Sequence, residues 1–352
     1  MGKERLLELD AFRGIAALAV VLFHYTTRFE QIFPVQGAMP FTVPLGYFGV
    51  NFFFIISGFV ILMTVERSAT LRQFVLSRFS RLYPVYWLAV SLTFWIVYFF
   101  PFSQGAVSQG LDIQAPISFA TYLINLTMLQ GFLKWPNVDG AYWSLAYELG
   151  FYIAMGTFLW RRELDRLYVA AWMALAGQWL LALAPRTIPH PLHLLLVLNG
   201  YSYLFVAGLA LFRLNNDWSS MRWWLLLAGC LLSNGLWFWH QGDAPHAWFF
   251  AAFIALFILG LKGHLLFLRW PPFRWLGSIS YSLYLIHEVV GWRLILGFYS
   301  LGLVHVYAMP LTLLLILLIA TLMTRLVEQP ALRWLRSTLG GRKVAGLPLT
   351  RD

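Results

Sequence analysis

Six ionisable side chains lie within or at the ends of strongly apolar stretches of this sequence. They are Arg13, His24, Glu148, His287, Glu288 and Arg293. An ionisable group is costly in hydrocarbon, so such groups usually face the interior of a helix bundle and often mark a functional site. Structural explanations compete with this one. Arg13 and Arg293 can extend to the nearest water, and Glu288 can bond a neighbouring helix, so its role stays open.

Arg13 and His24 form the pair with the most informative spacing. They are 11 residues apart, about three helical turns, which puts them on one helix face about 16 Å apart. Imidazole is suited to remove a proton from a hydroxyl or to carry a transferred group. From this pair alone, a histidine satisfied by hydrogen bonds in the core explains His24 equally well.

A second polar cluster lies in Trp143-Ser144-Leu145-Ala146-Tyr147-Glu148. Ser144 and Glu148 are four residues apart and share one face of a helix. Glu148 is therefore a candidate to orient His24 by bonding its second ring nitrogen, or to bind a substrate hydroxyl. The hypothesis that His24, Glu148 and His287 meet in the middle-to-outer half of a membrane depends on how the helices pack.

Two further motifs combine polar, small and basic residues. Asn51 and Ser57-Gly58 interrupt an aromatic run, and close helix packing explains Ser57 as well as a binding role does. Arg78 and Arg81 are three residues apart, so both guanidinium groups can project to one side and bind phosphate oxygens. Retention of positive charge on the cytoplasmic side is the simpler explanation of this arginine pair.

The elements that position these residues are predicted to be membrane-spanning helices. Hydrophobic residues make up 60% of the chain and charged residues 11%, with a mean hydropathy of +0.69, whereas about a quarter of the residues in a soluble domain are charged. Ten apolar segments have about the length needed to cross ~30 Å of hydrocarbon. They are residues 10–27, 45–64, 83–100, 143–160, 167–184, 194–212, 223–240, 246–261, 277–297 and 306–325.

The basic residues set the orientation of these segments. With a cytoplasmic N-terminus and ten spans, 21 of the 25 lysines and arginines fall on the cytoplasmic side. The exceptions are Arg28, Lys134, Arg186 and Arg293. Counting the weaker segment 117–133 as a span would spoil this pattern. The stretch 101–142 is therefore predicted to be an outer loop with an interfacial or re-entrant piece, and both termini are predicted to be cytoplasmic.

The predicted fold is an all-α polytopic bundle that forms one domain, residues 1–336, followed by a short disordered cytoplasmic tail, 337–352. The net charge of +10 is spread over short cytoplasmic loops with no long basic tract, so no nucleic-acid partner is expected. The single Cys230 excludes a disulfide framework and a cysteine metal cluster.

Six motifs, taken together and in order, resemble the acyltransferase-3 family of membrane acyltransferases. The resemblance covers nearly the whole chain, and the set of motifs is more specific than any one of them. The motifs are Leu9-Asp10-Ala11-Phe12-Arg13-Gly14-Ile15-Ala16 with His24, the segment Gly49–Phe59, Arg78-Phe79-Ser80-Arg81-Leu82-Tyr83-Pro84, the segment Trp143–Glu148, the segment Ser280–His287, and Glu328-Gln329-Pro330.

This resemblance implies transfer of an acyl group, commonly acetyl, from cytoplasmic acetyl-CoA or another acyl-CoA to a hydroxyl of a cell-envelope carbohydrate or glycolipid. Some members act on small molecules such as macrolides. The donor site would be cationic and use Arg13, Arg78 and Arg81, while His24 with Glu148 would be catalytic. His24 would act as general base or accept the acyl group transiently. The candidate acceptor-binding or oxyanion-stabilising residues are Asn51, Ser57, Trp143, Ser144 and His287.

Acyl-CoA would be a co-substrate, so no tightly bound cofactor and no metal are expected. The other expected partners are the acceptor and membrane lipid. The protein is expected in the inner (plasma) membrane. Some family members carry an extracytoplasmic hydrolase-like domain after the helices. Since this sequence shows none, we expect the bundle to finish the transfer or to hand the acyl group to a separate extracytoplasmic protein. The oligomeric state, the acceptor and the acyl group are left open.

A function from another class stays open as well. Buried histidine, glutamate and arginine side chains would also serve a proton-coupled transporter of a sugar or lipid-linked substrate. The absence of an internal repeat weighs against a transporter. The number of buried ionisable groups weighs against a non-catalytic scaffold.

Overall fold

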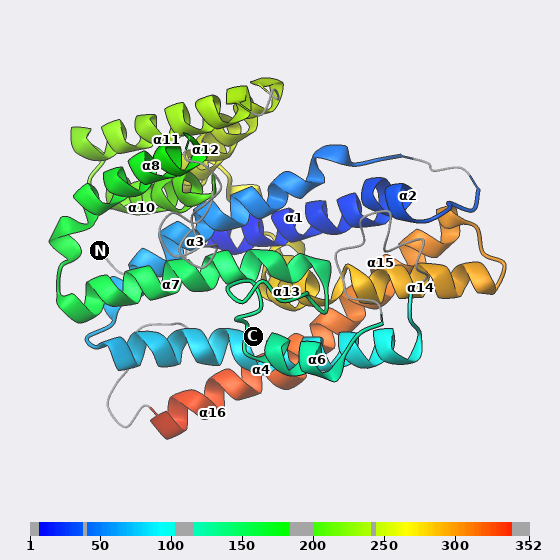
Figure 1. The fold of residues 1–352 in the computed structure, drawn as a ribbon. Coiled ribbons are helices and arrows are strands. Elements are labelled where there is room, and N and C mark those ends of the chain that lie inside the picture. Colours follow the sequence, from blue (N-terminus) through cyan, green and yellow to red (C-terminus); the bar gives the residue numbers. More distant parts are fainter. Residues whose placement is uncertain (1–6, 38–40, 103–115, 184–199, 241–243, 340–352) are drawn as a thin grey trace.

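The structure is a computed structural model that describes residues 7–37, 41–102, 116–183, 200–240 and 244–339. Within these ranges every regular element is a helix, and many of the helices lie side by side (Figure 1). The helices are α1 (Leu7–Phe23), α2 (Phe29–Ile32), α3 (Phe48–Arg67), α4 (Leu71–Phe99), α6 (Phe119–Leu126), α7 (Trp143–Arg161), α8 (Leu167–Leu183), α10 (Ser202–Asn216), α11 (Met221–His240), α12 (Trp248–Leu261), α13 (Pro271–Ile286), α14 (Val289–Ser300), α15 (His305–Met323) and α16 (Gln329–Leu339).

The all-helical prediction is confirmed, and each of the ten apolar segments lies largely on helix where it is described. Among the described residues, three helices are long and apolar enough to cross a membrane, and Trp248–Leu261 and Val289–Ser300 are shorter apolar helices. The three long ones are Pro44–Arg67, Leu71–Phe99 and His305–Trp334. The number of spans and the side on which each terminus lies stay predictions.

The basic stretch with Arg72, Arg78 and Arg81 and the third apolar segment, residues 83–100, form one helix, α4. It begins at Leu71, twelve residues before the predicted span 83–100, because Thr70 caps it by accepting a hydrogen bond from the Gln73 amide (3.2 Å). Arg78 and Arg81 therefore lie on a continuous helix just before Pro84, which α4 contains. A rigid element, and not a flexible loop, carries both guanidinium groups.

The weak apolar segment 117–133 contains only the eight-residue helix α6. Eight residues rise about 12 Å, too little to cross ~30 Å of hydrocarbon. The α6 helix runs antiparallel to α4: Tyr122 packs on Phe94, and further along the carbonyl of Leu126 accepts a hydrogen bond from the Trp87 indole (2.9 Å). The end of α6 therefore reaches the middle of α4, while the membrane depth of this segment stays a prediction.

The ninth apolar segment, 277–297, is broken. The α13 helix ends at Ile286 and α14 begins at Val289, so His287 and Glu288 lie in the break.

Near the C-terminus, α16 extends to Leu339, beyond the predicted domain boundary at residue 336. The rest of the predicted tail lies outside the described residues.

Close contact between glycines brings α1 and α13 together. A methyl group on Gly14 would overlap the backbone at Gly277, and one on Gly277 would overlap the backbone at Asp10. Small residues allow helices to approach this closely. His24 follows Gly14 by ten residues, as His287 follows Gly277. Because the two helices run in the same direction, an equal rise of about 15 Å brings both histidines to one level.

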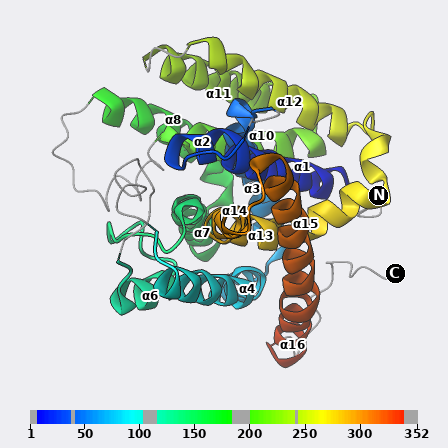
Figure 2. The same cartoon turned by 90° about the vertical axis from the view of Figure 1, so that its right-hand side faces the viewer.

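The helices around this pair are arranged in layers. In both views α11 and α12 lie on one side of α1, α3 and α13, and α4 and α6 lie on the opposite side (Figures 1 and 2). Glycines also fix the contact between α3 and α10, since a methyl group on Gly58 or Gly208 would overlap the backbone of the partner helix. The candidate site lies where α1, α3, α7 and α13 meet.

Candidate functional site

His24 begins a π-helical turn. Residues His24–Arg28 form the π-helix η1, which joins α1 to α2, and single π turns inside α-helices are frequent at functional sites. The indole N–H of Trp292 donates to the His24 carbonyl (2.9 Å), and Nε2 of His305 donates to the Tyr25 carbonyl (3.1 Å). Side chains from α14 and α15 therefore hold the turn that presents the His24 imidazole.

The two histidines contact one another directly. Nε2 of His287 lies 3.2 Å from Nδ1 of His24. Nδ1 of His24 also lies 2.9 Å from the Val20 carbonyl oxygen, and Nδ1 of His287 lies 2.8 Å from the Tyr284 carbonyl oxygen. Because a carbonyl oxygen only accepts, each Nδ1 carries the hydrogen. The His24 N–H is shared between Val20 and His287, so the lone pair of the neutral His24 ring is on Nε2.

The carboxylate beside His24 belongs to Glu288. Its Oε2 lies 3.5 Å from Nε2 of His24, and the side chains of His24 and Glu288 are only 15% and 7% exposed. The predicted contact between Glu148 and His24 is wrong. Glu148 instead accepts hydrogen bonds from Ser57 (2.9 Å) and Tyr152 (2.5 Å). The spacing of Ser144 and Glu148 defined a helix face but carried no information about which helix that face meets.

The break between α13 and α14 is held by hydrogen bonds from other segments. The Tyr142 hydroxyl donates to a carbonyl in the last turn of α13 (3.0 Å), and the Tyr25 hydroxyl donates to the His287 carbonyl (2.8 Å). The carboxylate of Asp139 accepts a hydrogen bond from the Val289 amide (3.2 Å) at the start of α14. Irregular backbone at membrane depth is tolerated where it is buried in protein and its polar groups are bonded.

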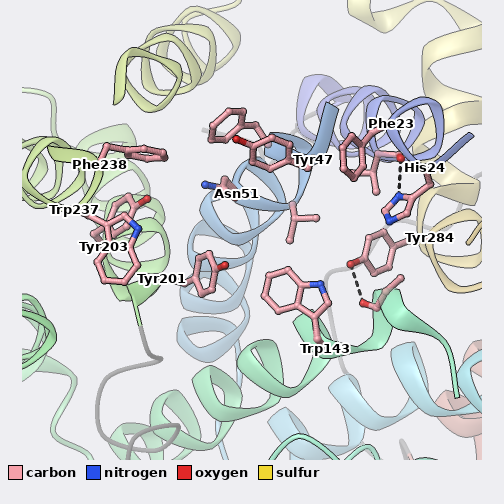
Figure 3. A pocket seen from close by; sticks show the side chains of 14 residues that line it. Phe23, His24, Tyr47, Asn51, Trp143, Tyr201, Tyr203, Trp237, Phe238 and Tyr284 are labelled. Carbon is pink, nitrogen blue, oxygen red and sulfur yellow. Dashed lines mark hydrogen bonds between the residues drawn. The ribbon is translucent and has the colours of Figure 1, made fainter. Parts of the chain in front are cut away.

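His24 forms part of the wall of a cavity of about 280 Å³ (Figure 3). Trp143 and Tyr284 lie next to it (Figure 3). The Tyr284 and Ser144 hydroxyls are 2.7 Å apart, which helps to fix the Tyr284 ring. Asn51 contributes an amide from α3. Most of the remaining wall is aromatic: Phe23, Tyr47, Phe48, Tyr201, Tyr203, Trp237 and Phe238.

Arg81 belongs to a second cluster, away from the cavity. It pairs with Glu328 (2.9 Å), whose side chain is 3% exposed. Glu328 lies on a second π-helix, η8 (Thr324–Glu328), between α15 and α16. Its other oxygen is 3.5 Å from the Ser282 hydroxyl of α13. Both π turns of the described chain thus carry a charged or ionisable residue to a buried contact.

The other two predicted donor-binding arginines join this cluster. Arg13 interacts electrostatically with Arg81 and Glu148, and Arg78 interacts with Arg81, Glu148 and Tyr152. Residues from α1, α4 and α7 that are far apart in sequence therefore converge on one arginine-rich region, which also contains Asp10. Glu148, with its bond to Ser57, is part of this region.

The structure divides the predicted site residues into two groups. His24, His287, Asn51, Trp143 and Ser144 lie at or beside the cavity. The arginine-rich region contains the rest: Arg13, Arg78, Arg81, Glu148 and Ser57. Sequence reasoning left Glu288 open and missed Tyr284, Trp292 and Asp139. The only available signal was the position of Glu288 directly after His287 at the end of a motif.

A divalent cation is a further chemical possibility for His24, His287 and Glu288. Each offers a ligand atom, and these atoms lie within 4.8 Å of one another. Each Nε2 atom already faces a partner, however. Nε2 of His287 accepts the hydrogen of His24 Nδ1, and Nε2 of His24 faces the Glu288 carboxylate. This chain of contacts suits proton transfer without rearrangement. The absence of a metal stays a prediction.

Comparison with known proteins adds to this geometry. The sequence profile of an acyltransferase domain matches residues 6–325, nearly the whole chain. The chain belongs to the acyltransferase-3 family. The match contains both clusters except Glu328, which follows its last residue. The resemblance inferred from the six motifs is therefore confirmed.

Several curated proteins are similar to this chain. Nodulation protein 10 of Rhizobium leguminosarum is 24% identical over 49% of the chain and 50% of its own length. Acyltransferase MdmB of Streptomyces mycarofaciens is 27% identical over 49% of the chain and 44% of its own length. Peptidoglycan O-acetyltransferase OatA of Listeria monocytogenes is 29% identical over 43% of the chain and 24% of its own length. The chain thus spans half or less of these relatives, and no solved structure matches it.

Proposed function

We propose that this acyltransferase moves an acyl group, most often acetyl, from cytoplasmic acyl-CoA to a hydroxyl of a cell-envelope carbohydrate or glycolipid. The observation that carries the proposal is the position of His24, on the wall of the cavity and between Glu288 and His287. The Nδ1 hydrogen is held by Val20 and His287, so Nε2 is the ring atom that does the chemistry.

Two routes use Nε2 of His24. In the first, Nε2 removes the hydroxyl proton while the oxygen attacks the thioester carbonyl, the C–S bond breaks, and the CoA thiolate takes the proton from the imidazolium. In the second, Nε2 attacks the thioester and releases the thiolate. The acceptor hydroxyl then attacks the acyl-imidazolium, the bond from the acyl carbon to Nε2 breaks to restore the neutral ring, and the hydroxyl proton passes to the thiolate. In both routes Glu288 stabilises positive charge on the ring, 3.5 Å away.

The arginine cluster supports an acyl-CoA donor. Guanidinium groups bind phosphate oxygens through paired hydrogen bonds, and coenzyme A carries several phosphates. Arg13, Arg78 and Arg81 converge from two helices, beside the carboxylates of Asp10, Glu148 and Glu328. Arg13 lies 11 residues before His24, about 16 Å along α1. A thioester arm that extends from a nucleotide at the arginines would cover this distance.

The cavity supports a carbohydrate acceptor. Its walls combine flat aromatic surfaces such as Trp143 and Tyr201 with polar groups, among them Asn51 and Tyr284. Such a pocket offers apolar faces for packing and a few polar groups for orientation. Of the similar proteins, OatA is named for O-acetylation of peptidoglycan, which contains sugar hydroxyls. The location in an inner (plasma) membrane and the role of a separate extracytoplasmic protein belong to this proposal as well.

Purified protein with labelled acetyl-CoA and envelope glycans tests the proposal. The wild type should release CoA and label the glycan, and His24→Ala should lower the rate at least ~10²-fold. His264→Ala, at an exposed loop position, is the matched control and should retain wild-type activity. Rapid quenching would show acyl-protein only if the acyl-imidazole route operates. A His24→Ala protein that transfers normally would refute the role of His24.

The same assay separates an acyltransferase from a proton-coupled transporter. The chain of His287, His24 and Glu288 would also pass protons. A transporter would move a sugar or lipid-linked substrate across proteoliposomes without releasing CoA or labelling a glycan. Transport without transfer would overturn the proposed function.

A further inference from the structure

The segment before α7 packs directly against the carboxylate of Glu288. Asp139 caps the 3-10 turn Gly140–Tyr142 by accepting a hydrogen bond from the Ala141 amide (3.0 Å). Its second oxygen accepts from the Val289 amide (3.2 Å), which immediately follows Glu288. Asp139 is fully buried, so one carboxylate ties the start of α7 to the start of α14.

Burial raises the pKa of Asp139 to about 7, an effect that the two backbone hydrogen bonds oppose. A buried carboxylate is costly unless donors satisfy it. The amides at the two helix starts provide donors, and the positive end of the α14 dipole adds favourable electrostatics. The capping geometry, and not the titration of Asp139, is what fixes the backbone on either side of Glu288.

Gly140 completes the contact, because its lack of a side chain leaves room for the Glu288 carboxylate. A Cβ atom at residue 140 would lie 2.4 Å from Oε1 of Glu288 and 3.0 Å from Oε2. Ordinary van der Waals contact begins near 3.4 Å, so the carboxylate would have to shift by about 1 Å. The group that would move is the end of a flexible side chain, and the backbone on both sides can keep its fold.

We propose that Asp139 and Gly140 are positioning residues that hold the Glu288 carboxylate against Nε2 of His24. Asp139 sets the backbone at the start of α14, and Gly140 forms the surface on which the carboxylate rests. This inference rests on the proposed function, since it assigns the outer loop a part in aligning the catalytic pair.

The substitution Gly140→Ala tests the inference. A displacement of about 1 Å at a catalytic group costs up to ~10²-fold in rate, so kcat should fall about 10- to 100-fold while KM for both substrates stays within about twofold. Gly297→Ala is the matched control. It adds the same methyl group on α14, where nothing lies within 4 Å, and should leave kcat unchanged.

A double-mutant cycle separates positioning from a general structural effect. If Gly140→Ala acts through the carboxylate, it should cause no further loss of kcat in a Glu288→Gln background. Equal fold-losses in both backgrounds would overturn the proposal, as would wild-type kcat in Gly140→Ala. Should Gly140→Ala fail to fold, Asp139→Asn replaces it in the same cycle, with the same two results deciding.

A measurement that needs no turnover distinguishes this inference from the proposed function. In histidine-labelled protein in detergent, the NMR signals of the His24 ring should shift in Gly140→Ala and not in Gly297→Ala. If the wild type transfers no acyl group but the His24 signals shift, the proposed function fails and the positioning contact stands. Unchanged His24 signals in Gly140→Ala would refute the contact itself.

Discussion

Replacing Glu288 with glutamine removes the negative charge next to His24 and keeps the size of the side chain. In the proposed mechanism the His24 ring becomes positive as it takes a proton or an acyl group. Oε2 of Glu288 lies 3.5 Å from Nε2, and both side chains are largely shielded from water. The glutamine variant should therefore lose transition-state stabilisation without losing substrate binding.

The distance sets the size of the effect. Two unit charges 3.5 Å apart attract by about 1 kcal/mol in water and about 5 kcal/mol at an effective dielectric constant of ~20. Each ~1.4 kcal/mol in the barrier is a factor of ten in rate. Burial of the pair favours the upper part of this range, so Glu288→Gln should lower kcat by about 10²- to 10³-fold.

Steady-state release of CoA, followed with a thiol reagent, measures this effect. Glu148→Gln is the informative comparison, because Glu148 lies with the arginines and bonds Ser57 and Tyr152. It should change KM for acyl-CoA more than kcat. If Glu288→Gln keeps kcat within threefold of wild type, or if Glu148→Gln shows the larger loss in kcat, the assignment of Glu288 as the partner of His24 is refuted.

Three other predictions follow from the same contacts. Trp292→Phe removes the indole donor to the His24 carbonyl (2.9 Å), which then keeps only the Phe29 amide of the π turn as a donor. Losing one buried hydrogen bond costs about 0.5–1.5 kcal/mol, so a thermal melt in detergent should show a lower midpoint and kcat should fall. An unchanged melt and kcat would argue against this support of the π turn. The double variant Arg78→Ala with Arg81→Ala should raise KM for acyl-CoA at least ~10-fold, because charged hydrogen bonds contribute about 1.5–3 kcal/mol each. Arg166→Ala, at an exposed position, is the control. If the double variant binds acyl-CoA as the wild type does, both arginines serve only to set the membrane orientation. Trp143→Ala should raise KM for the glycan acceptor and leave KM for acyl-CoA unchanged, and equal changes in both would remove Trp143 from the acceptor site.

The helical architecture was predictable because hydrocarbon imposes strong rules on sequence. A chain with 11% charged residues cannot cover its surface with polar groups, and backbone in lipid must satisfy its own hydrogen bonds, which favours helices. The apolar segments therefore located the helices well. The break in the segment 277–297 was not predictable, since its apolar pattern continues while side chains from distant segments bond the opened backbone.

The convergence of the arginines was predicted only as a shared side of the membrane. The structure adds that Arg13 and Arg81 interact although they lie on different helices, and that Glu328 pairs with Arg81. The π turns at His24–Arg28 and Thr324–Glu328 carry no compositional signal. A π turn is one extra residue in a helix, and neighbouring side chains stabilise it.

The sequence by itself determined that His24 is an ionisable residue about three helical turns after Arg13 in one apolar segment, because residue type and helical rise are local properties. It determined the family through motifs that keep their order along the chain. Only the tertiary structure decided that Glu288, and not Glu148, faces His24. Two carboxylates in apolar segments look alike in sequence. The choice between them depends on the close glycine contact of α1 with α13 and on the break that turns Glu288 toward the imidazole.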